Sequence, residues 1–182
     1  DSDYTSVGAR IVPDAKSVFE QSDMIVKVKE PQPVEIAMLE PRHTLFTYLH
    51  LAASRELTEG LLKSGATCIA YETVTGPKGG LPLLKPMSEV AGRMSVQVGA
   101  HFLEKEQGGR GILLGGVPGV APARVAILGG GTSGVNAAQM AVGMRADVTI
   151  YDISNERLAE LDMFFSSQIK TAYASKSAIE AA

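Results

Sequence analysis

Short apolar runs rich in branched residues alternate with amphipathic stretches along the 182 residues of the chain. Such alternation is typical of successive βαβ units, in which helices cover the strands of a largely parallel sheet. The apolar runs predict strands at residues 9–12, 24–28, 44–49, 67–71, 125–128, 148–151 and 169–173. The hydrophobic pattern therefore predicts an α/β fold.

The clearest early helix is predicted at residues 54–64. Ser54 is a suitable N-cap for it, and Gly65 follows its last residue, where a left-handed glycine commonly ends a helix. The predicted apolar face of this helix consists of Leu57, Leu61 and Leu62.

A longer helix is predicted at residues 88–104, with Ser88 as its N-cap and Met87 as a staple residue. Gly92 and Gly99 share one face of this helix. A glycine in a helix interior costs about 1 kcal/mol relative to alanine. The two glycines indicate that another backbone packs closely against this face, or else they are tolerated there by chance.

Charge and composition narrow the classes of partner. The chain has 17 basic and 20 acidic residues, so its net charge of −3 offers no strong field for nucleic acid or an anionic membrane. It has no uninterrupted run of 18 apolar residues that would span a bilayer. A small soluble molecule is the expected ligand.

The chain has a single cysteine, Cys68, inside the apolar run at 67–71. A thiol in such a run is more typical of a small core residue than of a nucleophile. A lone cysteine forms no internal disulfide, which fits a reducing compartment such as the cytoplasm. His43 and His101 have no metal-ligand spacing with each other or with Cys68, so no metal site is predicted.

The strongest motif is a glycine-rich turn after the predicted strand at 125–128. Gly129 permits a tight turn, Gly131 lets the backbone approach a pyrophosphate, and Gly134 lets helix and strand pack closely. Thr132 and Ser133 add hydrogen-bond donors on the same turn. The motif predicts a dinucleotide whose phosphates lie at the helix N-terminus.

Asp152 ends the next strand, 18 residues after Gly134. A carboxylate at this point accepts hydrogen bonds from both ribose hydroxyls and repels a 2′-phosphate, so NAD is preferred over NADP. The alternative is an ordinary strand-to-helix turn, with Asp152 capping the helix that begins near Ser154.

Three polar residues follow strands in the first half of the chain: Lys29, His50 and Glu72. If the strands are parallel, these side chains meet at one sheet edge and place an anion clamp beside a proton-transfer group. Each has a structural alternative. The alternatives are a solvated loop residue for Lys29, a core histidine for His50 and a partner of a neighbouring base for Glu72.

Five segments together resemble the family of alanine dehydrogenase and nicotinamide nucleotide transhydrogenase, and in particular alanine dehydrogenase. They are residues 26–31, 45–53, 69–74, 86–93 and 114–120. The resemblance extends over nearly the whole chain. The transhydrogenases lack the segment around His50, which places them second. A non-catalytic NAD-binding fragment is a third hypothesis.

The resemblance implies an oxidoreductase that catalyses the NAD-dependent, reversible oxidative deamination of L-alanine to pyruvate and ammonia. It implies that Lys29 binds the carboxyl or carbonyl oxygen of the substrate and that His50 is the acid/base. Glu72 is implied to be structural or to contact a cation. The implied NAD contacts are Ser88, Thr132, Ser133, Gly134, Asp152 and Arg157.

The resemblance further implies two Rossmann-like, doubly wound parallel-sheet domains, a substrate domain at 1–86 and an NAD-binding domain at 87–182, in a homohexamer. Composition alone instead places the boundary at 108–122, where six glycines and two prolines prevent a long regular element. The family's opening strand and a catalytic aspartate are expected before and after these residues, so the chain alone is expected to be inactive. Departures from the family pattern are Ala174, where a serine is expected, and Arg145, where a glycine is usual.

Overall fold

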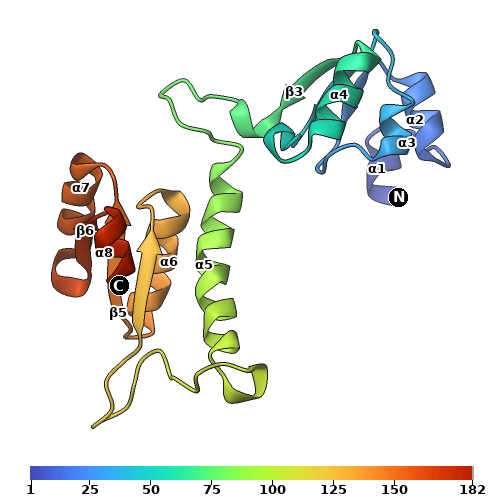
Figure 1. The fold of residues 1–182 in the computed structure, drawn as a ribbon. Helices are drawn as coiled ribbons and strands as arrows, with labels where there is room; N and C mark the ends of the chain where they lie inside the picture. The colour runs from blue at the N-terminus through green and yellow to red at the C-terminus, as the bar shows by residue number, and fades with distance from the viewer. Residues whose placement is uncertain (182) are drawn as a thin grey trace. The chain divides into compact units, whose positions relative to one another are not determined.

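The computed structural model describes residues 1–181 and divides into two compact units, Asp1–Leu84 and Lys85–Ala182. Each unit contains a parallel sheet of three strands with helices in the connections (Figure 1). The predicted fold class, α/β with two Rossmann-like units, is confirmed. No helix among residues 1–181 is both long and apolar enough to cross a membrane.

The first unit has a sheet in the order β1-β2-β3, and all neighbouring strands are parallel. Its core contains Leu45 and Leu49 at 0% and 1% exposure, together with Phe19, Ile25 and Leu61. The elements in chain order are α1 (Ser2–Ser6), α2 (Ala15–Gln21), β1 (Met24–Val26), α3 (Pro33–Ile36), β2 (Thr44–Thr47), η1 (Leu51–Ala53), α4 (Arg55–Ser64), β3 (Thr67–Ala70) and η2 (Tyr71–Thr73).

The strand predicted at residues 9–12 is wrong. These residues are irregular and mostly exposed, and Arg10 hydrogen bonds to Gln21 instead of pairing with a strand. The three true strands of this unit are shorter than predicted, because the chain turns away after Val26, Thr47 and Ala70. The polar residues at their carboxyl ends therefore lie beyond the sheet, Lys29 and His50 in loops and Glu72 in η2.

Helix α4 has the predicted ends. The Ser54 hydroxyl accepts a hydrogen bond from the N–H of Leu57, and Gly65 ends the helix in the left-handed conformation at φ 71°. Leu61 is buried as predicted, but Leu62 is 77% exposed. The reason is the helical period, since adjacent positions are 100° apart and Leu62 falls outside the stripe formed by Leu57 and Leu61.

Cys68 and His43 are structural residues of the first unit. Cys68 is partly buried against the core, and this burial raises the pKa of its thiol. His43 is 1% exposed, and both ring nitrogens are engaged, Nδ1 by the N–H of Glu40 and Nε2 by the carbonyl of Phe19, each at 2.9 Å. The engaged ring of His43 and the core contacts of Cys68 fit structural roles.

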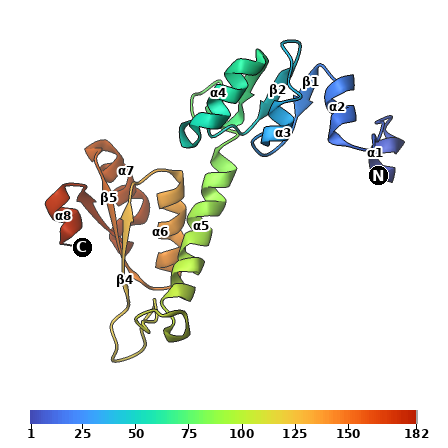
Figure 2. The ribbon, with the colours of Figure 1, turned by 45° about the vertical axis from the view of Figure 1, so that its right-hand side comes forward.

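The second unit has a parallel sheet in the order β4-β5-β6, with α6 and α7 in the two connections (Figure 2). Val148, Ile150, Ala138 and Leu161 form the centre of its core, each at 1% exposure or less. The elements in chain order are α5 (Lys85–Phe102), η3 (Lys105–Gln107), β4 (Arg124–Leu128), α6 (Thr132–Gly143), β5 (Asp147–Asp152), α7 (Asn155–Phe165), η4 (Ser166–Gln168), β6 (Lys170–Tyr173) and α8 (Lys176–Glu180).

Ser88 does not cap its helix, because α5 begins three residues earlier, at Lys85. Pro86 explains the early start, since proline is suited to the first helical turn. Helix α5 lies alongside α6 (Figures 1 and 2). At Gly92 a methyl group would strike the carbonyl oxygen of Ser133, whereas at Gly99 it would meet nothing within 4 Å. Close backbone packing therefore accounts for Gly92 and not for Gly99.

Residues 108–122 contain no helix or strand, as predicted, and they lie inside the second unit. Arg145, at the end of α6, adopts the left-handed conformation at φ 64°. The N–H of Ala146 donates to the carbonyl of Ala141, which is the hydrogen bond that closes a Schellman turn. This geometry explains why glycine is the residue expected at position 145.

Candidate functional site

The carboxyl ends of β1, β2 and β3 meet at one edge of the first sheet, because the three strands are parallel. Lys29 follows β1, and its carbonyl accepts a hydrogen bond from the buried Thr47 hydroxyl at 2.9 Å. Its side chain is exposed at this edge. The loop that carries Lys29 is thus fixed to β2, while the ammonium group stays accessible.

His50 follows β2 in an uncommon backbone conformation. Its φ and ψ are 47° and 41°, in the left-handed region that residues other than glycine rarely adopt. The carboxylate of Glu72 accepts the N–H of His50 at 2.6 Å and the N–H of Leu49 at 3.1 Å. Strain of this kind persists where surrounding contacts fix it, and it is frequent at functional positions.

Glu72 thus acts on the backbone at His50 and Leu49. Partial burial raises its pKa, but hydrogen bonds from its own N–H and those of His50 and Leu49 outweigh that effect, so the pKa is lowered overall. The side chain is therefore an ionised acceptor at neutral pH. Among residues 1–181 there is no group of three His, Cys, Asp or Glu side chains arranged to bind a metal ion.

The imidazole of His50 contacts a residue that the sequence did not single out. Its Nδ1 hydrogen bonds to Oε1 of Glu30, and its ring stacks on that of Tyr48 with centroids 6.1 Å apart. The pKa of Glu30 is lowered, first by a hydrogen bond from its own backbone N–H and then by His50 and the charge of Lys29. The only sequence signal for Glu30 was its position directly after Lys29.

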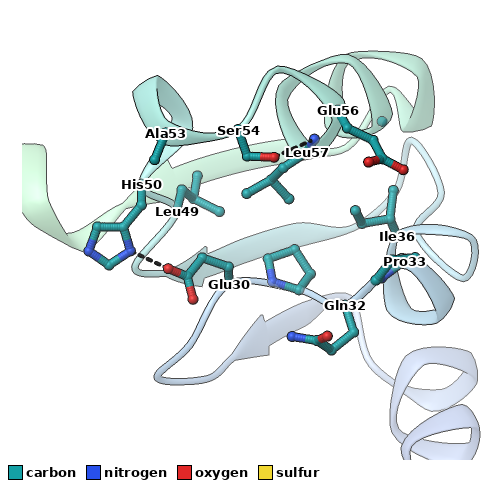
Figure 3. A pocket seen from close by; sticks show the side chains of 12 residues that line it. Glu30, Gln32, Pro33, Ile36, Leu49, His50, Ala53, Ser54, Glu56 and Leu57 are labelled. Atoms are coloured by element: carbon teal, nitrogen blue, oxygen red, sulfur yellow. Dashed lines mark hydrogen bonds and ion pairs between the residues drawn. The ribbon is translucent and has the colours of Figure 1, made fainter.

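A pocket of about 440 Å³ adjoins this pair (Figure 3). Glu30 and His50 form one end of it, and Leu49, Leu57 and Ile36 supply apolar walls. Gln32, Ser54 and Glu56 add polar groups elsewhere in the lining, so the pocket matches a small molecule with both apolar and polar parts.

The glycine turn of the second unit has three distinct environments. Gly129 has φ 99°, which favours glycine. At Gly134 a methyl group would strike the carbonyl oxygen of Gly129, so helix α6 and strand β4 approach closely there. At Gly131 a methyl group would meet nothing within 4 Å, which leaves room for a ligand against the backbone. This combination fits a pyrophosphate at the N-terminus of α6.

Asp152 lies directly beside this turn. Its Oδ2 accepts the N–H of Gly130 at 2.7 Å, and its Oδ1 accepts the N–H of Ser154 at 2.9 Å. These bonds, that of Gly130 first, lower the pKa of Asp152. The N-cap of α7 is Ser154, whose hydroxyl accepts the N–H of Arg157. A carboxylate has about four acceptor positions, so Asp152 retains capacity for ribose hydroxyls.

Arg157 also contacts the glycine turn. Its Nε donates to the carbonyl of Gly130 at 2.7 Å, and its Nη1 pairs with Glu160 at 2.5 Å. A methyl group at Gly130 would lie 2.5 Å from Leu161 and 3.2 Å from the Asp152 carboxylate. A side chain at position 130 would therefore crowd Leu161 and Asp152, a constraint that the spacing of the motif did not reveal.

The structure also brings Ser88 and Ser133 together. The Ser133 hydroxyl donates to the carbonyl of Ser88 at 3.0 Å, which ties α5 to the start of α6. Below them the buried Asn136 accepts from Arg93 and donates to the carbonyl of Thr132, both at 2.9 Å. Ser88, Thr132 and Ser133 thus lie near the glycine turn, and Asn136 and Arg93, which sequence reasoning missed, support it.

The chain resembles known proteins over its full length. Residues 1–91 match the family model described as "Alanine dehydrogenase/PNT, N-terminal domain", and residues 95–182 match "Alanine dehydrogenase/PNT, C-terminal domain". The curated alanine dehydrogenases of Halomonas elongata and Mycobacterium tuberculosis are 58% and 53% identical over all 182 residues. That of Bacillus subtilis is 56% identical over 168 residues, 92% of this chain and 44% of its own length.

Solved structures give the same result. An L-alanine dehydrogenase matches with a TM-score of 0.84 and 56% identity, over 100% of this chain and 50% of its own. A transhydrogenase from Sinorhizobium meliloti matches with a TM-score of 0.70 and 19% identity, over 99% of this chain and 52% of its own, which shows a similar fold alone. The chain spans about half the length of the Halomonas and Mycobacterium relatives, 49% in each case. With both family models matched and more than half of its residues shared with several members, the chain belongs to the alanine dehydrogenase/PNT family.

Proposed function

We propose that the chain is the part of an NAD-dependent alanine dehydrogenase that carries the acid/base group of the substrate site and the pyrophosphate turn of the cofactor site. The full protein would catalyse the reversible conversion of L-alanine to pyruvate and ammonia. Identity above 50% to several proteins with that name carries the proposal. We assign substrate binding to the unit that ends at Leu84 and NAD binding to the unit that begins at Lys85.

The cofactor assignment is supported by the fit of the glycine turn. The open backbone at Gly131 and the free amides at the start of α6 would hold the pyrophosphate, and the ionised Asp152 would accept the ribose hydroxyls. We assign further NAD contacts to Ser88, Thr132, Ser133, Gly134 and Arg157, which adjoin this turn. Bound NAD would supply the hydride acceptor of the reaction.

Lys29 and His50 would act on the substrate. The Lys29 ammonium is exposed at the sheet edge and suits a carboxylate or carbonyl oxygen. In the direction of pyruvate formation, a water oxygen bonds to the imino carbon of the oxidised substrate, and His50 would take up the proton that this water loses. In the reverse direction His50 would return the proton. The role that we assign to Glu72 is structural, because its carboxylate holds the backbone of His50.

Family membership is also the basis for expecting a homohexamer, and the lone Cys68 is consistent with a reducing cytoplasm. Small molecules, L-alanine or pyruvate and ammonia, are the proposed partners. Nucleic acid is not a proposed partner, because the net charge of the chain is −3.

The test is NADH formation by the full-length protein with L-alanine and NAD. His50→Asn should abolish at least about 99% of kcat, since acid/base groups commonly contribute 10² to 10⁴-fold. Asparagine suits the left-handed backbone, so folding should be retained. The matched control is His101→Asn, which changes an exposed histidine of the other unit.

NADH formation that does not depend on alanine would contradict the proposal. So would hydride exchange between two nicotinamide cofactors without a response to alanine. Full activity of His50→Asn would refute the assigned acid/base.

A further inference from the structure

Glu30 is placed to control the His50 side chain. It follows β1, whereas His50 follows β2, and the parallel register of the two strands brings their carboxyl ends together. The Glu30 carboxylate contacts Nδ1 of the ring, and the other nitrogen lies on the side away from Glu30 (Figure 3). Glu30 and His50 have 30% and 40% of their side-chain surfaces exposed, so the pair opens onto the pocket.

Other contacts restrict the same residue. Glu72 fixes the backbone of His50 through its N–H, and the ring of Tyr48 stacks on the imidazole with an interplanar angle of 20°. Tyr48 is itself held, because its hydroxyl donates to the carbonyl of Leu83 at 2.5 Å. Glu72 thus holds the backbone of His50, and Tyr48 flanks one face of its imidazole. A 180° flip of the imidazole would exchange its two ring edges.

We propose that Glu30 is a positioning residue for His50, which its carboxylate holds by Nδ1–H so that Nε2 is the nitrogen that exchanges protons with the substrate. This inference rests on the function proposed above. A carboxylate accepts from Nδ1–H whether the ring is neutral or protonated, so the contact persists while the proton at Nε2 comes and goes. The contact also selects the neutral tautomer with a free lone pair on Nε2. The other neutral tautomer, protonated on Nε2, would direct the lone pair of Nδ1 at the negatively charged carboxylate.

The ring nitrogens can be observed directly. The full-length protein, labelled with ¹⁵N in the histidine rings, is sedimented and studied by magic-angle-spinning NMR at a pH at which the ring is neutral. The His50 signals are assigned by their loss in His50→Asn. The expected result is a protonated Nδ1 and an unprotonated Nε2. An unprotonated Nδ1 in the native protein would overturn the proposal, and this arm requires neither turnover nor a Glu30 variant.

Steady-state kinetics provide a second test of the role of Glu30. Glu30→Ala should lower kcat for alanine oxidation by roughly 10- to 100-fold and move the ring toward the Nε2–H tautomer, with a much smaller change in KM. Glu30→Gln keeps an acceptor oxygen for Nδ1–H and should recover part of the loss. The matched control is Glu104→Ala, which removes a carboxylate 3.5 Å from Nδ1 of the exposed His101. Its kinetics should be native.

The outcomes separate the two hypotheses. If the native full-length protein forms no NADH with alanine, the proposed function fails while the NMR result still decides the Glu30–His50 contact. If native turnover is present and Glu30→Ala retains native kcat and native ring signals, the positioning role fails and the proposed function stands.

Discussion

The carboxylate of Asp152 accepts a hydrogen bond from the backbone N–H of Gly130 at 2.7 Å. One acidic side chain therefore shapes the glycine turn and also offers its remaining acceptor positions to a ligand. Arg157 donates to the carbonyl of the same glycine, so an anion holds the N–H of Gly130 and a cation holds its C=O.

Replacing Asp152 should alter both cofactor affinity and cofactor choice. In Asp152→Ala we expect Kd for NAD to rise by roughly 5- to 150-fold, equivalent to about 1–3 kcal/mol for lost hydrogen bonds to a charged acceptor. The preference for NAD over NADP should shrink, because Arg157 remains beside the turn without the repelling carboxylate. Calorimetric titration of the full-length variant with each cofactor measures both effects.

The control for this experiment is Asp147→Ala, at the opposite end of β5, where the carboxylate pairs with Lys170 on the surface. It should leave both dissociation constants unchanged. Native NAD affinity in Asp152→Ala would contradict the assigned ribose contact.

Gly92 and Gly99 form a matched pair on one helix. Gly92→Ala should destabilise the protein by about 1–3 kcal/mol, because the new methyl group strikes the Ser133 carbonyl and lies 2.9 Å from Cβ of Asn136. Gly99→Ala should stabilise it by up to about 1 kcal/mol, since the position is helical and open. Urea unfolding of the full-length variants gives the two free energies. Equal effects of the same sign would refute the packing of α5 on α6.

Glu72 should make stability depend on pH in the acidic range. Its folded-state pKa is lowered from 4.5, so the folded state releases this proton more readily than the unfolded state. The stabilisation is therefore present above about pH 4.5 and is lost as the pH falls through the lower folded-state pKa. At neutral pH we expect Glu72→Gln to cost about 1–2 kcal/mol, because Leu49 and His50 lose a charged acceptor.

The free energies of unfolding of the native protein and Glu72→Gln should converge as the pH is lowered from about 6 to about 3. Glu20→Gln is the control, because its exposed carboxylate pairs with the Lys16 side chain at 3.6 Å instead of holding a backbone N–H. A constant difference between native protein and Glu72→Gln over this range would show that the carboxylate does not hold the backbone.

Local sequence signals predicted the features that depend on neighbouring residues. Ser54 and Gly65 mark the ends of α4 because each acts within one helical turn. The glycine turn at 129–134 was predictable for the same reason. The predicted strand at 9–12 failed because a strand requires a partner, and an apolar run carries no information about whether one lies beside it.

The candidate site was predictable only in part. Lys29, His50 and Glu72 were singled out because each follows a strand, and the parallel sheet does bring those strand ends to one edge. The contact between Glu30 and His50 spans 20 positions and depends on strand register and loop direction, neither of which a single sequence specifies. Ser88 was predicted as the cap, whereas the helix begins at Lys85 with Pro86 in its first turn.

The left-handed backbone at His50 limits which residues can occupy that position, independently of any chemistry. Valine, isoleucine and threonine are excluded by their branched Cβ, whereas glycine and asparagine fit with little strain. In a saturation library, the absence of branched residues among folded variants would therefore say nothing about proton transfer. Asparagine and glycine are tolerated by the backbone but cannot transfer a proton. The loss of activity in these two variants therefore measures the contribution of the imidazole.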